Sequence, residues 1–341
     1  MSTSWRSSSL RAIEELFRRR NREMPERNRL QALLPVGAEA LLNRVGTAPG
    51  ILMRFGNRLV ACLPGVPYEM KIMFEEQLIP RLRSLGWVTR VLVSRKINLF
   101  GKGESEVEKE ASDLTVRGRD PEVGITAHDA TISFRVTAAG ANEEEAEARL
   151  GPTLAIIRER FEPLIVGEGQ DDVPEAVFAQ LQRTGVTLAT AESCTGGLIA
   201  HLLTRIGGIS PYFLGGVVSY ANAAKSGLLG VEPHQIEAHG AVSSEVAAAM
   251  AVGVRQRLQA DLGLSVTGIA GPTGGTPEKP VGLVYLGLAT ENGVETRRLE
   301  LGPEQPRSVI QSRSAKHALN WVRQTLRSRP ASPGSSAGLL G

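Results

Sequence analysis

The stretch Ala191-Glu192-Ser193-Cys194-Thr195-Gly196-Gly197 lies where a predicted strand ends and a helix begins. Backbone N–H groups converge at such a turn, which therefore suits an oxyanion or a phosphate. Because strand side chains alternate, Ser193 and Thr195 are expected on one face and Cys194 on the other. A plainer alternative is that Ser193 or Thr195 only caps the helix.

The sequence around this turn alternates strands and helices. We expect helices at 174–183, 196–206, 222–229, from Ser243 or Ser244 to about 260, and at 306–327; strands are expected at 185–191, 215–220, 262–267, 281–290 and 294–301. Alternation of this kind predicts a three-layer α/β domain whose ligand crevice lies at the carboxyl ends of its strands. Residues 328–341 are rich in Ser, Pro and Gly and are expected to be a disordered tail.

A second segment, Val217 to Lys225, ends a strand and begins a helix, with Asn222 and Lys225 one turn apart on a common face. Lys225 is one of seven lysines and lies among Ala, Ser and Gly rather than on a charged stripe. A lysine in such surroundings can lose solvation, lower its pKa and act as a general base for a hydroxyl. An ordinary solvated helix lysine is the alternative.

A third segment, Ser265 to Gly275, is a loop with four glycines that follows a strand. Such loops let backbone amides approach a phosphate, although a flexible turn has the same composition. The three segments together fit one crevice at the edge of an α/β sheet.

Five motifs carry a resemblance to a known family: AESCTGG (191–197), SYANAAK (219–225), HGAVS (239–243), TGIAGPTGG (267–275) and KPVGLVY (279–285). They resemble the C-terminal domain of the CinA family, whose relatives are nicotinamide-mononucleotide deamidases. The resemblance covers residues 173–327. It implies that the carboxamide of this small-molecule substrate is hydrolysed to nicotinic acid mononucleotide and ammonia in pyridine-nucleotide recycling, without a cofactor.

The resemblance also implies roles for individual residues. Ser193 would be the nucleophile and Lys225 its base. Tyr220 and Asn222 would help to orient them. The expected substrate-binding residues are Thr195, Gly196, Gly197, Asn222, Thr267, Gly268, Gly271, Gly274 and Arg307.

Two points stay open within this site. Relatives often have an arginine where Gln311 aligns, so the cation for the substrate phosphate could be Arg307 or Arg313. Cys194 is the rival nucleophile, although a small buried residue is its more ordinary role. No metal is expected: the histidines at 234 and 239 are five apart, which does not place them together on a helix as a metal pair.

The first part of the chain resembles the later part of the CinA N-terminal domain, which is related to molybdopterin-binding proteins. The matching stretches are 22–28, 45–50 and 63–70. The preceding glycine-rich nucleotide loop and paired aspartates are not in this sequence, so residues 1–88 look like a truncated domain. Either the chain start is misassigned or the first activity has decayed. Metal-dependent ADP-ribose pyrophosphatase activity is therefore expected to be absent, and a divalent metal would be expected only for an intact domain.

Local patterns within residues 1–88 predict a hairpin across Gly56-Asn57 and a helix from Tyr68 to Leu85. The expected inward side chains of that helix are Met70, Met73, Phe74 and Ile79.

Residues 89–168 predict a small α+β unit and resemble the KH-like middle domain of the same family. Its expected helices are 104–114 and 142–161. A KH domain binds RNA through a Gly-x-x-Gly clamp, and Gly101-Lys102-Gly103-Glu104 does not match it. We therefore expect a spacer or oligomerisation module rather than an RNA-binding one. The polar, glycine-rich residues 167–172 are expected to be the next linker.

Composition narrows the class of protein. Hydrophobic residues make up 42% and charged residues 22%, as in folded proteins, and only Cys62 and Cys194 occur. No apolar run is long enough to span a membrane, so we expect a cytoplasmic protein without a membrane partner. Residues 1–100 carry 17 Lys/Arg against 8 Asp/Glu, but aromatic residues are only 4%, so nucleic-acid binding is not expected.

The predicted protein is therefore a homo-oligomeric amidohydrolase with a three-layer α/β C-terminal domain, preceded by a KH-like α+β domain and a partial α/β domain. The alternative function is a catalytically inactive, nucleotide-binding or regulatory protein associated with competence or DNA damage.

Overall fold

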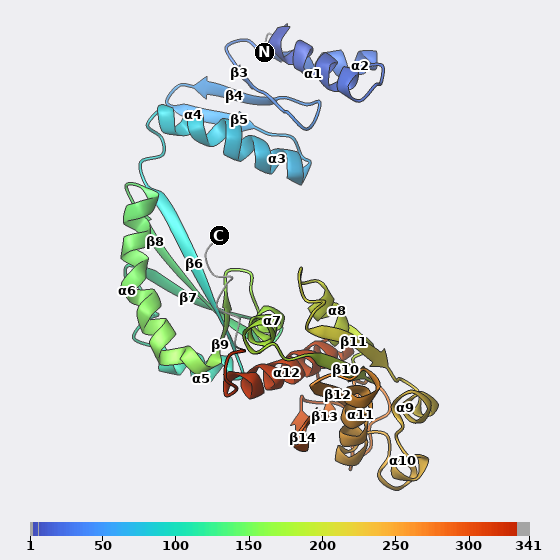
Figure 1. Cartoon of the computed structure of the whole chain (residues 1–341). Helices are drawn as coiled ribbons and strands as arrows, with labels where there is room; N and C mark the ends of the chain where they lie inside the picture. Colours follow the sequence, from blue (N-terminus) through green and yellow to red (C-terminus); the bar gives the residue numbers. More distant parts are fainter. Residues whose placement is uncertain (1–2, 6, 333–341) are drawn as a thin grey trace. The chain divides into compact units, whose positions relative to one another are not determined.

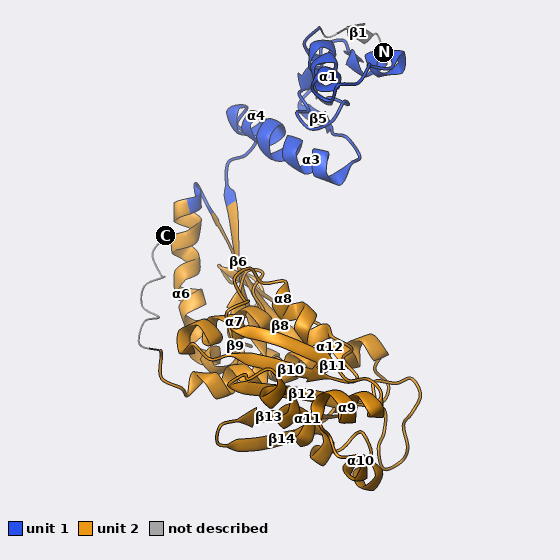
Figure 2. Ribbon diagram, turned by 45° about the vertical axis from the view of Figure 1, so that its right-hand side comes forward, with its two compact units in different colours: residues 1–91, 140–143 blue, residues 92–139, 144–341 orange. Residues whose placement is uncertain are grey.

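The computed structural model of the chain describes residues 3–5 and 7–332 (Figure 1). The chain divides into two compact units, one of residues 1–91 and 140–143 and the other of residues 92–139 and 144–341 (Figure 2). No helix in the described part is long and apolar enough to cross a membrane.

The first unit contains two small antiparallel sheets and several short helices. One sheet pairs β1 (Thr3–Trp5) with β2 (Leu33–Pro35), and the other has the order β3 (Glu39–Leu41), β4 (Gly50–Phe55) and β5 (Arg58–Cys62). The helices are α1 (Ser7–Arg19), α2 (Glu26–Arg29), α3 (Pro67–Met73) and α4 (Ile79–Ser84). The expected hairpin across Gly56-Asn57 is confirmed, with Gly56 at the positive φ (58°) that this turn requires.

The inward face predicted for the helix of this unit is partly wrong. Met73 is fully buried, but Met70 and Phe74 are exposed. A single π-helical turn, Phe74–Leu78, separates α3 from α4. Such a turn adds one residue to the helical repeat. The inward position after Met73 therefore falls five residues later, on Leu78.

The second unit begins with a four-stranded sheet of order β7-β8-β6-β9. Its elements are β6 (Val91–Phe100), α5 (Glu104–Glu110), β7 (Glu122–His128), β8 (Thr131–Gly140), α6 (Glu143–Phe161) and β9 (Ile165–Glu168). Helix α6 packs on β8 through Phe161, whose ring centroid lies 5.1 Å from that of Phe134. Helix α5 ends before the predicted Leu114, because Arg160 binds both the Glu110 carbonyl (2.7 Å) and the Asp113 carboxylate.

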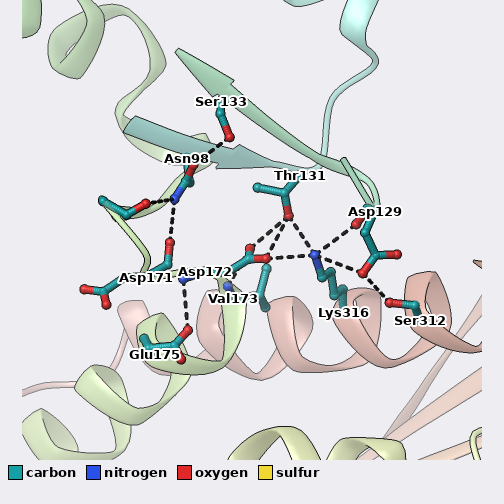
Figure 3. A network of polar contacts seen from close by, with 11 residues as sticks. Asn98, Asp129, Thr131, Ser133, Asp171, Asp172, Val173, Glu175, Ser312 and Lys316 are labelled. Carbon is teal, nitrogen blue, oxygen red and sulfur yellow. Dashed lines mark hydrogen bonds and ion pairs between the residues drawn. The ribbon is translucent and has the colours of Figure 1, made fainter. Parts of the chain in front are cut away.

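Residues 167–172, expected to be the linker to the next domain, are held by hydrogen bonds (Figure 3). Its first two residues belong to β9. The Asn98 side chain donates to the carbonyl of Asp171 (2.7 Å), and Asp172 caps the next helix by accepting from the Val173 N–H (2.8 Å). The Asp172 carboxylate also pairs with Lys316 (2.8 Å). The contacts of this segment hold β9 against the start of α7, although residues 168–171 remain exposed.

The carboxyl-terminal part is built on a five-stranded sheet of order β11-β10-β12-β13-β14. The strands are β10 (Leu188–Glu192), β11 (Phe213–Val218), β12 (Leu262–Gly268), β13 (Leu283–Thr290) and β14 (Gly293–Glu300). Strand β10 runs parallel to β11 and β12, whereas β13 is antiparallel to both β12 and β14.

Helices cover both faces of this sheet, so the predicted three-layer α/β architecture is confirmed. On one face α7 (Val173–Thr184), α8 (Leu198–Thr204) and α12 (Arg307–Arg327) pack on residues such as Leu188 and Leu264. On the other face α9 (Asn222–Leu229), α10 (Pro233–His239) and α11 (Ser244–Arg257) pack on Ala189 and Ala191. Helix α10 was not expected from the sequence. Ile236 is its one buried residue, so the segment lacks the repeated apolar positions that predict a helix.

The first residues of the predicted disordered tail, 328–332, are held in place by hydrogen bonds. The Ser332 N–H donates to the Arg183 carbonyl (3.0 Å), and the Arg183 guanidinium donates to the Arg329 carbonyl (2.9 Å). Residues 328–332 therefore pack on α7. The rest of the predicted tail, 333–341, lies outside the described residues.

Candidate active site

The carboxyl ends of the three parallel strands meet at one edge of the sheet. Ser193 follows β10, Ser219 follows β11, and a glycine-rich loop follows β12. The Ser193 N–H donates to the Val266 carbonyl (2.9 Å), and the Ser219 N–H donates to the Glu192 carbonyl (2.8 Å). These bonds extend the strand pairing by one residue and hold the loops in register.

Ser193 and Lys225 are in direct contact. The Lys225 Nζ lies 3.0 Å from the Ser193 Oγ, within the range expected for a nucleophile and its base. The same Nζ lies 2.8 Å from the Ser219 carbonyl oxygen and 3.2 Å from that of Tyr220. Lys225 is 1% exposed and Ser193 8% exposed, so bulk water does not surround the pair.

The surroundings of Lys225 favour its neutral form. Burial lowers the pKa of its amine below the ordinary value. No carboxylate forms an ion pair with Lys225 anywhere in residues 3–5 and 7–332. A neutral amine has two N–H donors and one lone pair. The two carbonyls can accept both donors, which leaves the lone pair directed at the Ser193 hydroxyl.

The Glu192 carboxylate binds backbone N–H groups at the turn that the sequence suggested as an oxyanion or phosphate site. Its buried carboxylate accepts from the N–H groups of Gly197 (3.0 Å), Ile199 (3.0 Å) and Ala200 (2.9 Å). The Gly196 N–H donates to the Ser193 carbonyl (3.1 Å). The expectation that the Gly196 and Gly197 amides contact substrate is therefore wrong. Their positive φ angles (63° and 97°) instead let the chain turn from β10 into α8.

The sequence contains a feature that predicts the structural role of Glu192. It is a carboxylate at the end of a strand whose five residues are all buried, and a helix begins within six residues. A buried acid in that position needs donors, and the first N–H groups of a helix are the nearest ones.

Thr195 and Thr267, both expected to bind substrate, differ in their hydrogen bonding. Thr195 is buried and its Oγ1 has no hydrogen-bond partner among the described residues. The Thr267 Oγ1 donates to the Ala241 carbonyl (2.7 Å) and thus ties β12 to the start of α11.

The glycine loop after β12 is shaped by packing. A Cβ on Gly268 would lie 2.7 Å from the Val284 side chain, so this glycine permits close contact with β13. Gly271 and Gly274 have φ of 74° and 89°, which favour glycine. The Gly271 carbonyl accepts from Arg307 (2.8 Å), which joins this loop to α12.

Asn222 does not orient the pair. Its side chain is exposed at the first residue of α9, whereas Lys225 is buried. Residues three apart are rotated by about 60° around a helix, so one can enter the core while the other stays outside. The backbone carbonyls of Ser219 and Tyr220 orient the lysine instead.

Arg307 and Tyr220 form the rim of the site. The Arg307 guanidinium donates to the Tyr220 hydroxyl (3.0 Å), and the Tyr220 side chain is 61% exposed. Gln311, one turn further along α12, donates to the Cys194 carbonyl (2.8 Å). Arg313 instead lines a separate cavity. Of these two arginines, Arg307 is therefore the one that contacts residues of the predicted site, namely Tyr220 and Gly271.

Cys194 is poorly suited to be the nucleophile. It is 4% exposed within an apolar cluster, and burial raises the pKa of its thiol to about 12. A thiol with that pKa stays protonated at neutral pH, and the thiolate is the reactive form. In the described part of the chain no three His, Cys, Asp or Glu side chains gather as metal ligands.

Comparison with known proteins gives consistent matches. The sequence profile of the CinA C-terminal domain matches residues 170–326, and that of the damage-inducible protein CinA KH domain matches residues 94–167. A CinA-like protein of Kosmotoga olearia is 41% identical over 93% of this chain and 76% of its own length. A putative competence-damage inducible protein of Moorella thermoacetica is 44% identical over the same shares. A crystal structure of the competence/damage inducible protein CihA from Agrobacterium tumefaciens is 40% identical, covers 46% of this chain and 95% of its own, and has a TM-score of 0.44.

Proposed function

The chain belongs to the CinA family, and from this membership and the geometry around Ser193 we propose that it hydrolyses the carboxamide of nicotinamide mononucleotide to nicotinic acid mononucleotide and ammonia. The observation that carries the proposal is a lysine with a lowered pKa, 3.0 Å from a serine hydroxyl. That pair is a complete nucleophile and base for acyl transfer.

The first half of the reaction forms an ester. Lys225 accepts the hydroxyl proton as the Ser193 Oγ attacks the carboxamide carbon, which gives a tetrahedral oxyanion. The protonated amine then gives that proton to the nitrogen, the C–N bond breaks and ammonia leaves. The unpaired Thr195 hydroxyl is our candidate donor to the oxyanion.

The second half returns the enzyme to its starting state. A water attacks the ester carbon while Lys225 accepts one of its protons. The tetrahedral intermediate breaks its bond to Ser193, and Lys225 returns the proton to the departing oxygen. One water is consumed, and nicotinic acid mononucleotide is released.

The two charged groups of the substrate, its pyridinium ring and its phosphate, fit Lys225 and Arg307 respectively. The substrate carries a cationic pyridinium ring, which a neutral Lys225 does not repel. Its phosphate needs a cation with several donors, and Arg307 at the rim is our candidate.

The test is ammonia release from the purified chain given nicotinamide mononucleotide. Ser193→Ala should lower turnover by roughly four to six orders of magnitude without changing the fold, as nucleophile deletions do. Cys194→Ala is the matched control at the next residue and should retain most activity. Activity near the wild-type level in the serine variant would overturn the mechanism, whereas loss only in the cysteine variant would make Cys194 the nucleophile. No activity in the wild-type protein would favour the binding or regulatory alternative.

A further inference from the structure

A cavity of about 530 Å³ lies in the second unit, between the four-stranded sheet and α12. One wall is the loop after β6 together with the β7–β8 turn, and the other is formed by α12 and the end of β14. Neither Ser193 nor Lys225 lines it. Its volume lies in the range of small-molecule sites. Its lining includes Phe100, His128, Asp129, Glu300, Arg313 and His317.

Arg313 is a cation of this cavity that has no anionic partner among the described residues. Its Nε is buried and has no hydrogen-bond partner among the described residues, and no carboxylate there forms an ion pair with it. A buried donor without an acceptor is unfavourable, because it has lost its hydrogen bonds to water. The guanidinium stays charged at any physiological pH, and its planar fork matches a carboxylate or a phosphate.

Most of the acids near Arg313 have another partner. The Asp129 carboxylate is held by Lys316 (3.3 Å) and by the Ser312 hydroxyl, as Figure 3 shows. Glu300 pairs with Arg298 (2.8 Å), and Glu304 accepts from Gln305 (3.1 Å). On the opposite wall Glu106 accepts from the Gly103 N–H (3.1 Å). Glu104 also lines the cavity, and neither it nor another carboxylate of the described residues forms an ion pair with Arg313. The chain itself thus leaves the Arg313 guanidinium without an anionic partner.

Part of the cavity lining is apolar and aromatic. The Phe100 and His317 rings pack edge to face with centroids 4.9 Å apart, and Ala130, Ile132 and Leu301 also line the cavity. Burial lowers the pKa of His317, so its ring adds no second charge at neutral pH. Apolar and aromatic side chains beside an unpaired guanidinium suit an organic acid better than an inorganic ion.

We propose that this cavity binds a small organic anion, whose carboxylate or phosphate pairs with Arg313 and whose apolar or aromatic body lies over Phe100 and His317. This site is distinct from the serine site, and its existence does not depend on the deamidase activity.

Histidine side-chain NMR of the full chain tests the site directly. Of the five histidines, His128 and His317 line the cavity, whereas His234 lies on α10 and serves as the remote reporter. The probes are adenosine monophosphate for a phosphate and benzoate for a carboxylate, each added to about 10 mM, which saturates a millimolar site. Either probe should shift the His128 and His317 signals saturably and leave His234 unchanged. The probe that succeeds identifies the anionic group.

Variants separate this site from the serine site and from loss of folding. Arg313→Gln should weaken the response at least tenfold, and Arg313→Lys, which keeps the charge and the packing, should weaken it less. Arg205→Gln is the matched control. Arg205 is an exposed arginine at the carboxyl end of α8, outside the cavity, and its substitution should not change the response. An unchanged His234 signal reports that a variant is folded. The proposal is overturned if neither probe shifts the two signals, or if Arg313→Gln responds like the wild type.

Discussion

Lys316 tests whether the ion-pair network between α12 and the preceding sheet stabilises the second unit. Its side chain is 8% exposed and its Nζ lies 2.8 Å from Asp172 and 3.3 Å from Asp129. The same Nζ donates to the Asp129 carbonyl and to the Thr131 hydroxyl, both at 2.9 Å (Figure 3). Lys316→Met keeps the length of the side chain, so the substitution removes charge and donors without opening a large cavity.

The expected loss of stability depends on the hydrogen bonds and the solvent exposure that Asp172 and Asp129 keep in the variant. Removing one partner of a buried ion pair costs about 3–5 kcal/mol. The side chains of Asp172 and Asp129 are 26% and 28% exposed, and Asp172 still accepts from Thr131 and Val173. We therefore expect the lower end, about 3 kcal/mol, which is a fall in Tm of about 6–12 °C for a unit of this size.

Thermal and urea unfolding followed by circular dichroism measure this loss. Lys109→Met, the same change on the exposed face of α5, is the matched control and should stay within about 0.5 kcal/mol of the wild type. Adding Asp172→Asn to Lys316→Met removes a carboxylate left without its cation and should recover part of the stability. A loss below about 1 kcal/mol for Lys316→Met, with no recovery in the double variant, would refute the reasoning.

Four further predictions concern the serine site. Lys225→Arg should be nearly as inactive as Lys225→Ala, because a guanidinium keeps the charge but cannot accept a proton; substantial turnover would reduce Lys225 to a binding residue. In the wild type, burial lowers the pKa of Lys225 and only the neutral amine is active, so kcat/KM should fall as pH drops through that lowered pKa; a flat acid limb would contradict the role. Glu192→Gln should lower the free energy of unfolding by about 2 kcal/mol, because three amides lose a charged acceptor, and Glu108→Gln on exposed α5 should not; equal Tm values for the two variants would argue against the cap. Arg307→Lys should raise KM for nicotinamide mononucleotide about tenfold with little change in kcat, since one point charge replaces a fork; an unchanged KM would assign the phosphate to another residue.

Much of the fold could be predicted from local patterns. Apolar spacing of period two or 3.6, glycine turns and helix caps are properties of neighbouring residues, so the strands and helices of the carboxyl-terminal part were largely anticipated. The contact of Ser193 with Lys225 also followed, because both lie just after strands that a parallel sheet brings to one edge. Where a local pattern was interrupted, as by the π-helical turn after Met73, the predicted face was wrong.

Only the tertiary structure decided which groups serve the site and which serve the fold. Spacing cannot tell whether an amide is already paired, and the Gly197 amide is engaged by Glu192. Nor can it tell which way a helix faces: Arg307 lies at the serine site, but Arg313, six residues further along α12, lines another cavity. Sequence determines the helix and its period, whereas the rotation of that helix about its axis depends on every surface packed against it.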